Sequence, residues 1–102
     1  AKTMAAARKQ APVVAQNISN ALNSIAPSSS YDGYGSCPLT VEKGKIVLAE
    51  FCYGAKVKPT FPSWVNDGTK PTRFAWMFTA NILPSIYWKA MLKGREWLAS
   101  PK

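Results

Sequence analysis

Apolar residues recur at steps of three and four positions along the first part of the chain, between Lys2 and Ile25. This spacing is typical of a helix with one apolar face. We expect Thr3 to be the N-cap residue of this helix. Pro12 has no N–H to donate to the carbonyl of Arg8, which predicts either a kink or a helix that restarts at Ala11. The predicted apolar stripe consists of Ala7, Ala11, Val14, Ile18, Ala21, Leu22 and Ile25.

Two short apolar segments after this helix predict a β-hairpin. The polar stretch 26–30 first breaks the helix and is expected to be a linker. Leu39–Val41 and Ile46–Phe51 are then strand-like, and the four residues 42–45 join them. A turn centred on Lys43 and Gly44 places alternate residues of both strands on one face. That predicted face contains Cys37, Leu39, Val41, Ile46, Leu48 and Cys52.

The same register predicts that Cys37 and Cys52 are near neighbours across the two strands. A local disulfide between them is one alternative. The other is that Cys37 is a free thiol, buried as a small apolar residue.

The second half of the chain begins with an irregular segment and continues into helices. Prolines and a glycine interrupt residues 56–71, where Phe61 and Trp64 are expected to pin the segment to an apolar surface. From Thr72 onward, an apolar helix is predicted to end before Pro84, which then opens a second helix in its first turn.

These C-terminal helices have the composition of an interfacial membrane segment. Trp88 and Trp97 lie among the cations Lys89, Lys93 and Arg95, and bulky apolar side chains flanked by Trp and cations favour a membrane surface. The alternative is a pair of core helices whose lysines extend their charged ends to water. We favour the membrane surface because the whole chain is positively charged.

Together these elements predict an α+β fold with a long N-terminal helix, a β-hairpin, and one or two amphipathic C-terminal helices. Residues 1–30 form the helix and linker, and residues 31–102 form the hairpin and the helical region as a single small domain. The chain begins with Ala1, within the helical pattern, and is expected to be a fragment of a larger protein. An isolated hairpin is marginal and an apolar helix face would be exposed, so we expect a homo-oligomer.

The amino-acid composition excludes some classes of function and favours an anionic partner. Thirteen Lys and Arg residues against five Asp and Glu residues give a net charge of +8, which favours an anionic partner. The sequence has no histidine, which excludes Ser-His-Asp and Cys-His catalysis within it, and two cysteines alone do not form a structural zinc site. A nucleic-acid partner is disfavoured because the basic residues are spread over three segments and the aromatic residues follow a helical period.

The surroundings of Cys37 favour a fixed thiol. The preceding residues 31–35, Tyr-Asp-Gly-Tyr-Gly, supply two glycines that tolerate positive φ and an aspartate that can form an Asx turn. Pro38 fixes its own φ and favours an extended conformation at Cys37. The thiol is therefore expected at a point where a loop meets a strand, a common location for chemistry.

Three blocks of sequence resemble one enzyme family. Residues 31–51, YDGYGSCPLTVEKGKIVLAEF, follow AKTMAAARKQAPVVAQNI and precede LPSIYWKAMLKGREW. In this order the blocks resemble the C-terminal part of sulfide:quinone oxidoreductases, flavoproteins of the pyridine nucleotide-disulfide oxidoreductase-like superfamily. The resemblance extends from about Ala1 to Trp97.

The resemblance implies an enzyme that oxidises hydrogen sulfide to sulfane sulfur and passes two electrons through FAD to a membrane quinone. Cys37 matches the second of the family's two redox cysteines, the one that sulfide attacks to form a persulfide. Lys2 and Thr3 match the start of a helix whose N-terminus points at the flavin, where the helix dipole favours negative charge. The partner cysteine and the dinucleotide-binding glycines are absent from these residues and are expected upstream. The fragment alone is therefore expected to be inactive, with Cys52 a bystander.

The resemblance also implies a monotopic membrane anchor in the C-terminal helices, on the bacterial or mitochondrial inner membrane. The competing function is a non-catalytic, basic amphipathic module for membrane-surface or protein contact. The candidates for quinone or membrane contact are Phe74, Trp76, Phe78, Ile82, Leu83, Tyr87 and Trp88.

Overall fold

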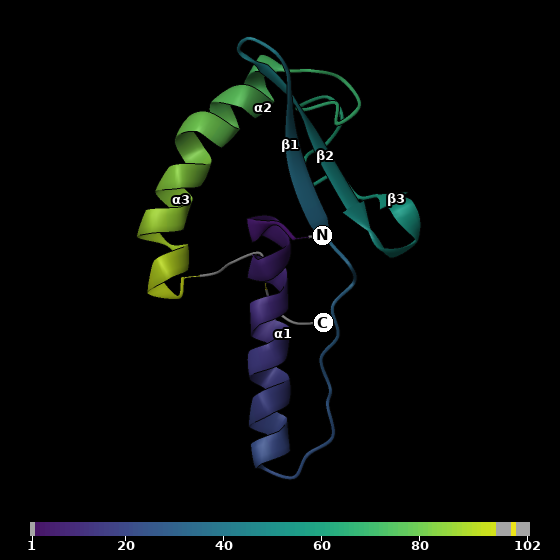
Figure 1. Cartoon of the computed structure of the whole chain (residues 1–102), viewed down its shortest axis with the longest axis vertical. Coiled ribbons are helices and arrows are strands. Elements are labelled where there is room, and N and C mark those ends of the chain that lie inside the picture. Colours follow the sequence, from purple (N-terminus) through teal and green to yellow (C-terminus); the bar gives the residue numbers. More distant parts are fainter. Residues whose placement is uncertain (1, 96–98, 100–102) are drawn as a thin grey trace.

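The computed structural model describes residues 2–95 and 99, and it confirms the α+β class. Figure 1 shows a long helix, a small antiparallel sheet and a curved C-terminal helical rod. Trp97 lies outside the described residues. The elements in order are α1 Met4–Leu22, β1 Gly35–Glu42, β2 Lys45–Cys52, η1 Tyr53–Ala55, β3 Lys56–Val57, α2 Arg73–Met77, η2 Phe78–Ile82, α3 Leu83–Lys89 and η3 Met91–Lys93.

Helix α1 begins where the sequence predicts and ends earlier. The Thr3 side-chain oxygen accepts a hydrogen bond from the Ala6 N–H at 3.3 Å, which confirms Thr3 as the N-cap. The helix continues through Pro12 and does not restart at Ala11. It ends at Leu22 because Ser24 adopts a left-handed backbone with φ +56°, and the Ile25 N–H bonds back to the Asn20 carbonyl at 2.8 Å.

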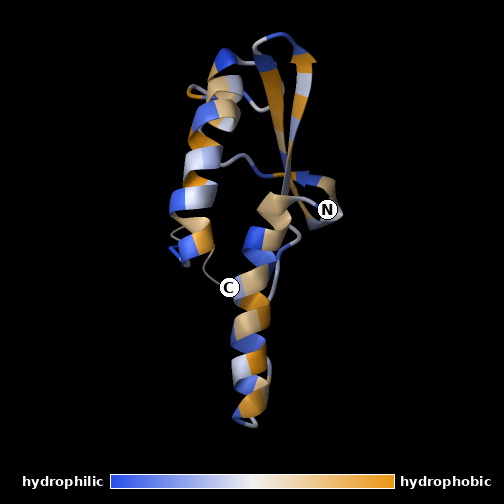
Figure 2. Cartoon of the chain, turned by 60° about the vertical axis from the view of Figure 1, so that its left-hand side comes forward, coloured by the Kyte–Doolittle hydropathy of each residue, from blue (hydrophilic) through white to orange (hydrophobic). Residues whose placement is uncertain are grey.

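The apolar stripe of α1 is exposed to solvent in the described structure. Val14 is 54% exposed, Ile18 55% and Leu22 82%, whereas Ala6 is fully buried. Figure 2 shows apolar positions recurring along the part of α1 that extends away from the sheet. No described residue therefore packs over this part of the stripe.

The predicted linker, residues 26–30, is hydrogen-bonded to the side of α1. The Asn17 side chain accepts hydrogen bonds from the N–H groups of Ser28 and Ser29 and donates one to the Ser29 carbonyl at 2.9 Å. Asn20, which is 7% exposed, donates to the Ser28 hydroxyl at 2.8 Å and to the Ala26 carbonyl at 3.3 Å. These contacts hold the irregular segment along the helix, as Figure 1 shows.

The hairpin turn is predicted correctly, but the strand register differs by one residue. Glu42 pairs with Lys45 across the turn, and an irregularity between Thr40 and Glu42 leaves Val41 outside the register. Leu39 consequently pairs with Val47 and lies on the face opposite Ile46 and Leu48. The prediction that Leu39 and Val41 share the buried face is therefore wrong. A third short strand, β3, adds to β2 and makes a sheet of order β1-β2-β3.

A small core lies between β2 and α2. Ile46, Leu48 and Ala75 are 3%, 5% and 0% exposed, and Phe61 packs against them. The Phe61 ring also meets the rings of Phe74 and Phe78 edge-on, with centroids 5.4 and 5.3 Å away. Phe61 therefore pins the irregular segment to the core, as predicted.

The same prediction is wrong for Trp64, which is 85% exposed.

Helix α2 has a fixed start. The Thr72 side chain accepts a hydrogen bond from Ala75 N–H at 3.1 Å and donates one to the buried Asn66 side chain at 2.6 Å. The Thr72 backbone also bonds to Ile46, which ties the helix start to β2.

The C-terminal helices form one curved rod instead of two separated helices. Pro84 lies in the first turn of α3, as predicted. The residues before it stay helical in a π-type turn, η2, in which the Leu83 N–H bonds to the Phe78 carbonyl. A π turn re-routes helical hydrogen bonds where the regular pattern is interrupted. Among residues 2–95, no helix combines the length and apolar character needed to cross a membrane.

The aromatic contacts of Phe61 predict a clear difference between two loop substitutions. Phe61→Ala removes the ring that packs on Phe74 and Phe78, and we expect a loss of roughly 2–4 kcal/mol in unfolding free energy because the site is partly buried. Trp64→Ala, in the same segment, should change it by less than about 0.5 kcal/mol. Urea unfolding of both variants measures this difference, and equal losses would contradict the packing of Phe61.

Candidate functional site

Cys37 is a half-buried free thiol in β1. It lies opposite Ala49 of β2, in the extended conformation expected before Pro38. Cys52 lies three residues beyond Ala49 and so points to the other face of the sheet. The prediction that the two cysteines are neighbours is wrong, because the irregularity near Val41 shifts the register by one residue. Both thiols are free, so the local disulfide does not form.

A tight turn fixes the chain just before Cys37. The Tyr34 N–H donates to the Asp32 carboxylate at 3.1 Å, which confirms the Asx turn. Gly33 has φ +81°, and a Cβ atom there would lie 2.4 Å from the ring of Tyr53. The Asp32 carboxylate also pairs with Lys58 at 2.6 Å. Only a glycine fits at position 33, because both the backbone angle and the space require it.

The N-terminal end of α1 lies against the end of the sheet at which β1 begins. Helix α1 contacts β1, and Figure 1 shows the first turn of the helix beside the start of that strand. The Lys9 ammonium lies 5.8 Å from the centre of the Tyr34 ring, a cation–π distance. The structure therefore brings Lys2 and Thr3, which precede α1, to the end of the sheet at which Cys37 lies.

The first turn of α1 presents a positive pole at this place. Thr3 satisfies the Ala6 N–H, while the N–H groups of Met4 and Ala5 precede the first intrahelical bonds. The side chain of Lys2 is exposed. Such an end favours an anionic group through the aligned peptide dipoles.

A buried carboxylate next to this site was missed at the level of sequence. Glu50 is 4% exposed and its oxygens accept hydrogen bonds from the Tyr34 hydroxyl at 2.5 Å and from the Thr60 N–H at 2.8 Å. The Thr60 hydroxyl donates to the same carboxylate. Glu50 lies opposite Ser36, the residue before Cys37. The one signal in the sequence is that Glu50 continues the alternation of Ile46 and Leu48 toward the core.

The surroundings of Tyr34 favour its protonated form. Burial and the hydrogen bond to Glu50 raise the pKa of Tyr34 to about 12. The hydroxyl is therefore a permanent donor to Glu50 at neutral pH, and it joins the start of β1 to β2.

The predicted quinone or membrane contacts divide into two groups. Phe74 and Phe78 belong to the aromatic cluster with Phe61, and Leu83 and Tyr87 are half-buried. The exposed members of the predicted set are Trp76 at 43%, Ile82 at 38% and Trp88 at 65%.

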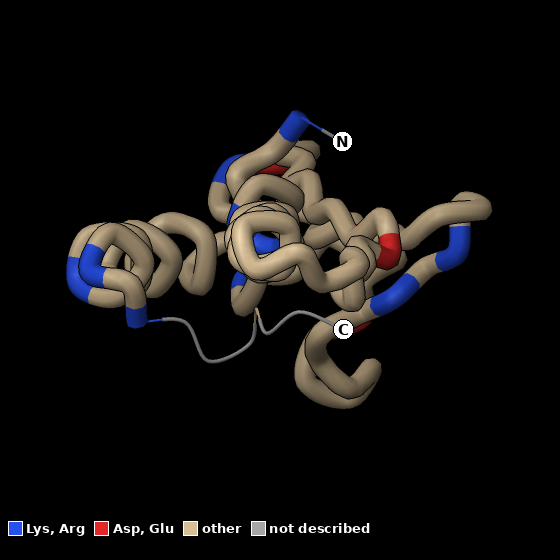
Figure 3. The backbone as a smooth tube through the Cα atoms, turned by 90° about the horizontal axis from the view of Figure 1, so that it is seen from below, with Lys and Arg blue, Asp and Glu red and all other residues tan. Residues whose placement is uncertain are grey.

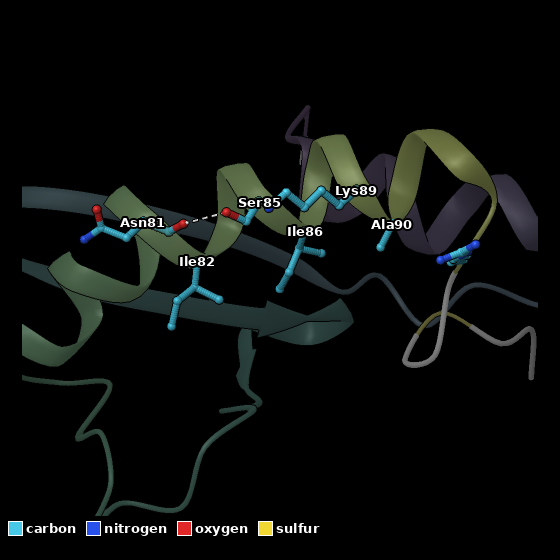
Figure 4. A pocket seen from close by; sticks show the side chains of 7 residues that line it. Asn81, Ile82, Ser85, Ile86, Lys89 and Ala90 are labelled. Carbon is cyan, nitrogen blue, oxygen red and sulfur yellow. Dashed lines mark hydrogen bonds between the residues drawn. The ribbon is translucent and has the colours of Figure 1, made fainter.

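A shallow hollow of about 350 Å³ lies along the C-terminal rod. Figure 4 shows its side chains along η2 and α3 and the residue after α3, with both apolar and polar positions among them. The residues that line it are Asn81, Ile82, Ser85, Ile86, Lys89, Ala90 and Arg95.

The raised pKa of Tyr34 predicts a pH-dependent contribution to stability. Tyr34→Phe removes a donor to buried Glu50 and should lower the unfolding free energy by about 1–3 kcal/mol at neutral pH. The unfolded chain ionises Tyr34 near its ordinary value of 10, before the folded chain does near 12. The difference in unfolding free energy between the wild type and Tyr34→Phe is thus at its full value below pH 10 and is lost as the pH rises toward 12. Urea unfolding of both proteins across this range measures the difference, and a pH-independent difference would contradict the buried contact.

Comparison with known proteins identifies the family. No protein-family profile matches the chain. The chain is 40% identical to a mitochondrial sulfide:quinone oxidoreductase of Dictyostelium discoideum over 92% of its length. It is 36% identical to the Schizosaccharomyces pombe protein of that name over 97% of its length, and 34% identical to the Mus musculus protein over 91%. It spans only about a fifth of each relative, between 20% and 22% of their lengths. These matches confirm the resemblance, and the chain, which corresponds to about one fifth of the length of these relatives, belongs to the sulfide:quinone oxidoreductase family.

Proposed function

We propose that this chain is the C-terminal segment of a flavoprotein that oxidises sulfide to sulfane sulfur and transfers the electrons through FAD to a quinone. The observation that carries the proposal is the placement of Cys37. It is a free, half-buried thiol whose backbone is fixed by the preceding turn and by Pro38, and it lies at the end of the sheet where α1 begins. The names of the three relatives support the same reaction for the longer protein.

Cys37 is the sulfur that sulfide attacks in this proposal. In the oxidised protein it forms a disulfide with a cysteine outside this chain. Hydrosulfide forms a new S–S bond to Cys37 while the old S–S bond breaks, and the electron pair of that bond leaves on the partner cysteine as a thiolate. The product on this chain is a Cys37 persulfide, whose outer sulfur passes to a nucleophilic acceptor. No histidine is needed, because thiolate and hydrosulfide are the reacting species.

The start of α1 fits one side of the flavin. The N–H groups of Met4 and Ala5 are open toward the helix end, the Thr3 side chain is turned to Ala6, and Lys2 adds an exposed positive charge. These groups would hold negative charge on the ring system through hydrogen bonds and the helix dipole. When bound, FAD supplies the two-electron acceptor that connects thiol chemistry to the quinone. Most of its binding site lies in the remainder of the longer protein.

The C-terminal rod associates with a membrane surface in this proposal. Trp76 and Trp88 are exposed, and the rod carries cations near its end. Exposed tryptophans beside cations are typical of segments that lie in the membrane interface. The quinone then reaches the flavin from the membrane, past the apolar side chains of the rod. The mitochondrial names of the relatives support a mitochondrial membrane.

The apolar stripe of α1 keeps a second function open, a non-catalytic module for membrane-surface or protein contact. Ile18 and Leu22 are 55% and 82% exposed, as a docking face would be. In the proposed enzyme, the rest of the longer protein or a second copy covers this stripe. The non-catalytic module predicts vesicle binding that survives Cys37→Ser, together with no flavin dependence.

The two cysteines provide a matched test of the proposed role. In the longer protein that carries this chain, anaerobic sulfide should bleach the flavin absorbance, and quinone should restore it. Cys37→Ser should abolish bleaching by sulfide while leaving the bound flavin reducible by dithionite. Cys52→Ser, which changes a half-buried thiol on the opposite face, should behave as the wild type. Bleaching of the Cys37→Ser protein at the wild-type rate would overturn the assignment.

A further inference from the structure

The hollow on the C-terminal rod is bordered by two rows of side chains. Ile82, Ile86 and Ala90 follow one another at intervals of four residues and form an apolar row. Asn81, Ser85 and Lys89 form a second row beside it, as Figure 4 shows. Because a helix rises 1.5 Å per residue, each row is about 12 Å long. The hollow is therefore elongated, with its apolar side along the helix.

The polar row is neutral except at its end. The Ser85 hydroxyl donates to the Asn81 carbonyl at 3.2 Å, and the Asn81 amide donates to the Met77 carbonyl at 3.3 Å. These two side chains are thus occupied by the helix backbone. The charges of the hollow are those of Lys89 and Arg95, both exposed, and neither forms an ion pair with another described residue.

The rod as a whole carries positive charge only. Between residues 73 and 95 the sequence has Arg73, Lys89, Lys93 and Arg95 and no Asp or Glu, and one acidic residue, Glu96, follows Arg95 directly. Figure 3 shows basic positions at the end of the rod, and further basic positions on the other elements of the chain. Beside them, Trp88 and Leu92 are 65% and 57% exposed. The end of the rod combines large apolar side chains with an excess of cations.

From this arrangement we infer that the hollow binds one anionic phospholipid, with the headgroup phosphate between Lys89 and Arg95 and an acyl chain along Ile82 and Ile86. Arg and Lys are the side chains that bind phosphate oxygens, Arg through a planar pair of donors. A free phosphate would use only the charged end, whereas a lipid also covers the apolar row. The inference rests on the membrane association proposed above and assigns it a headgroup preference.

Vesicle binding by the longer protein tests this site. Vesicles of phosphatidylcholine are compared with vesicles that also contain phosphatidylglycerol, and bound protein is measured by sedimentation. We expect tighter binding to the anionic vesicles. The double variant Lys89→Gln/Arg95→Gln should bind them about 30-fold more weakly, given the usual contribution of two cations near an anionic surface. It should approach the wild type on phosphatidylcholine alone.

A second double variant controls for net charge. Lys43→Gln/Lys56→Gln removes two exposed charges from the hairpin turn and β3, far from the end of the rod that carries Lys89 and Arg95 (Figure 1), and should bind anionic vesicles nearly as the wild type does. Equal losses in both double variants would overturn the site, because they would show attraction by diffuse charge. If inorganic phosphate at the same concentration as the lipid displaced the protein from the vesicles, the ligand of the hollow would be a free phosphate ion and the proposal of a lipid would be overturned.

The flavin test separates this inference from the proposed reaction. Equal binding to both kinds of vesicle would overturn the headgroup preference and leave membrane association in place. Sulfide-dependent bleaching in the Lys89→Gln/Arg95→Gln protein is expected to be unchanged in detergent solution. Weaker anionic binding with intact bleaching is the result that supports the lipid site.

Discussion

Burying the carboxylate of Glu50 imposes the strongest constraint on this fold, because a charged group removed from water must receive hydrogen bonds from the protein. Its donors are Tyr34 and Thr60, 16 residues before it and 10 residues after it in the chain. Tyr34 fixes the start of β1 against β2. Thr60 draws the irregular segment across the sheet and so places Phe61 in the core beside Phe74. One buried acid thereby organises three segments.

This constraint also decides how Cys37 is presented. Tyr34 is held by Glu50 on the buried face, and Gly33 allows the tight turn that precedes it. Strand alternation then places Cys37 on the face opposite Glu50, half-buried and away from Cys52. In the proposed enzyme, this thiol on a fixed strand, free in the described structure, would react with a cysteine and a flavin that the rest of the longer protein provides. The proposed thiol chemistry therefore depends on the packing of residues that take no part in the reaction.

Short-range features of the fold were predictable and long-range ones were not. The cap at Thr3 and the turn at Lys43 and Gly44 depend on neighbours within a few residues, so their residue types suffice. The register shift near Val41 does not show in the sequence, because it depends on which strand face packs against α2. Phe61 and Trp64 have the same local appearance, and only the distant Phe74 and Phe78 distinguish them. The candidate site shows the same limit: its motif made Cys37 a candidate, whereas Glu50, whose donors Tyr34 and Thr60 are distant in the sequence, was missed.

The most direct test of the central claim is the position of sulfane sulfur after the longer protein reacts with sulfide. Lys43 and Lys45 lie between the two cysteines, so trypsin places Cys37 and Cys52 on different peptides. After alkylation and digestion, mass spectrometry should find one additional sulfur atom on the Cys37 peptide and none on the Cys52 peptide. An additional sulfur on Cys52 alone, or on neither cysteine while the flavin is reduced, would contradict the account.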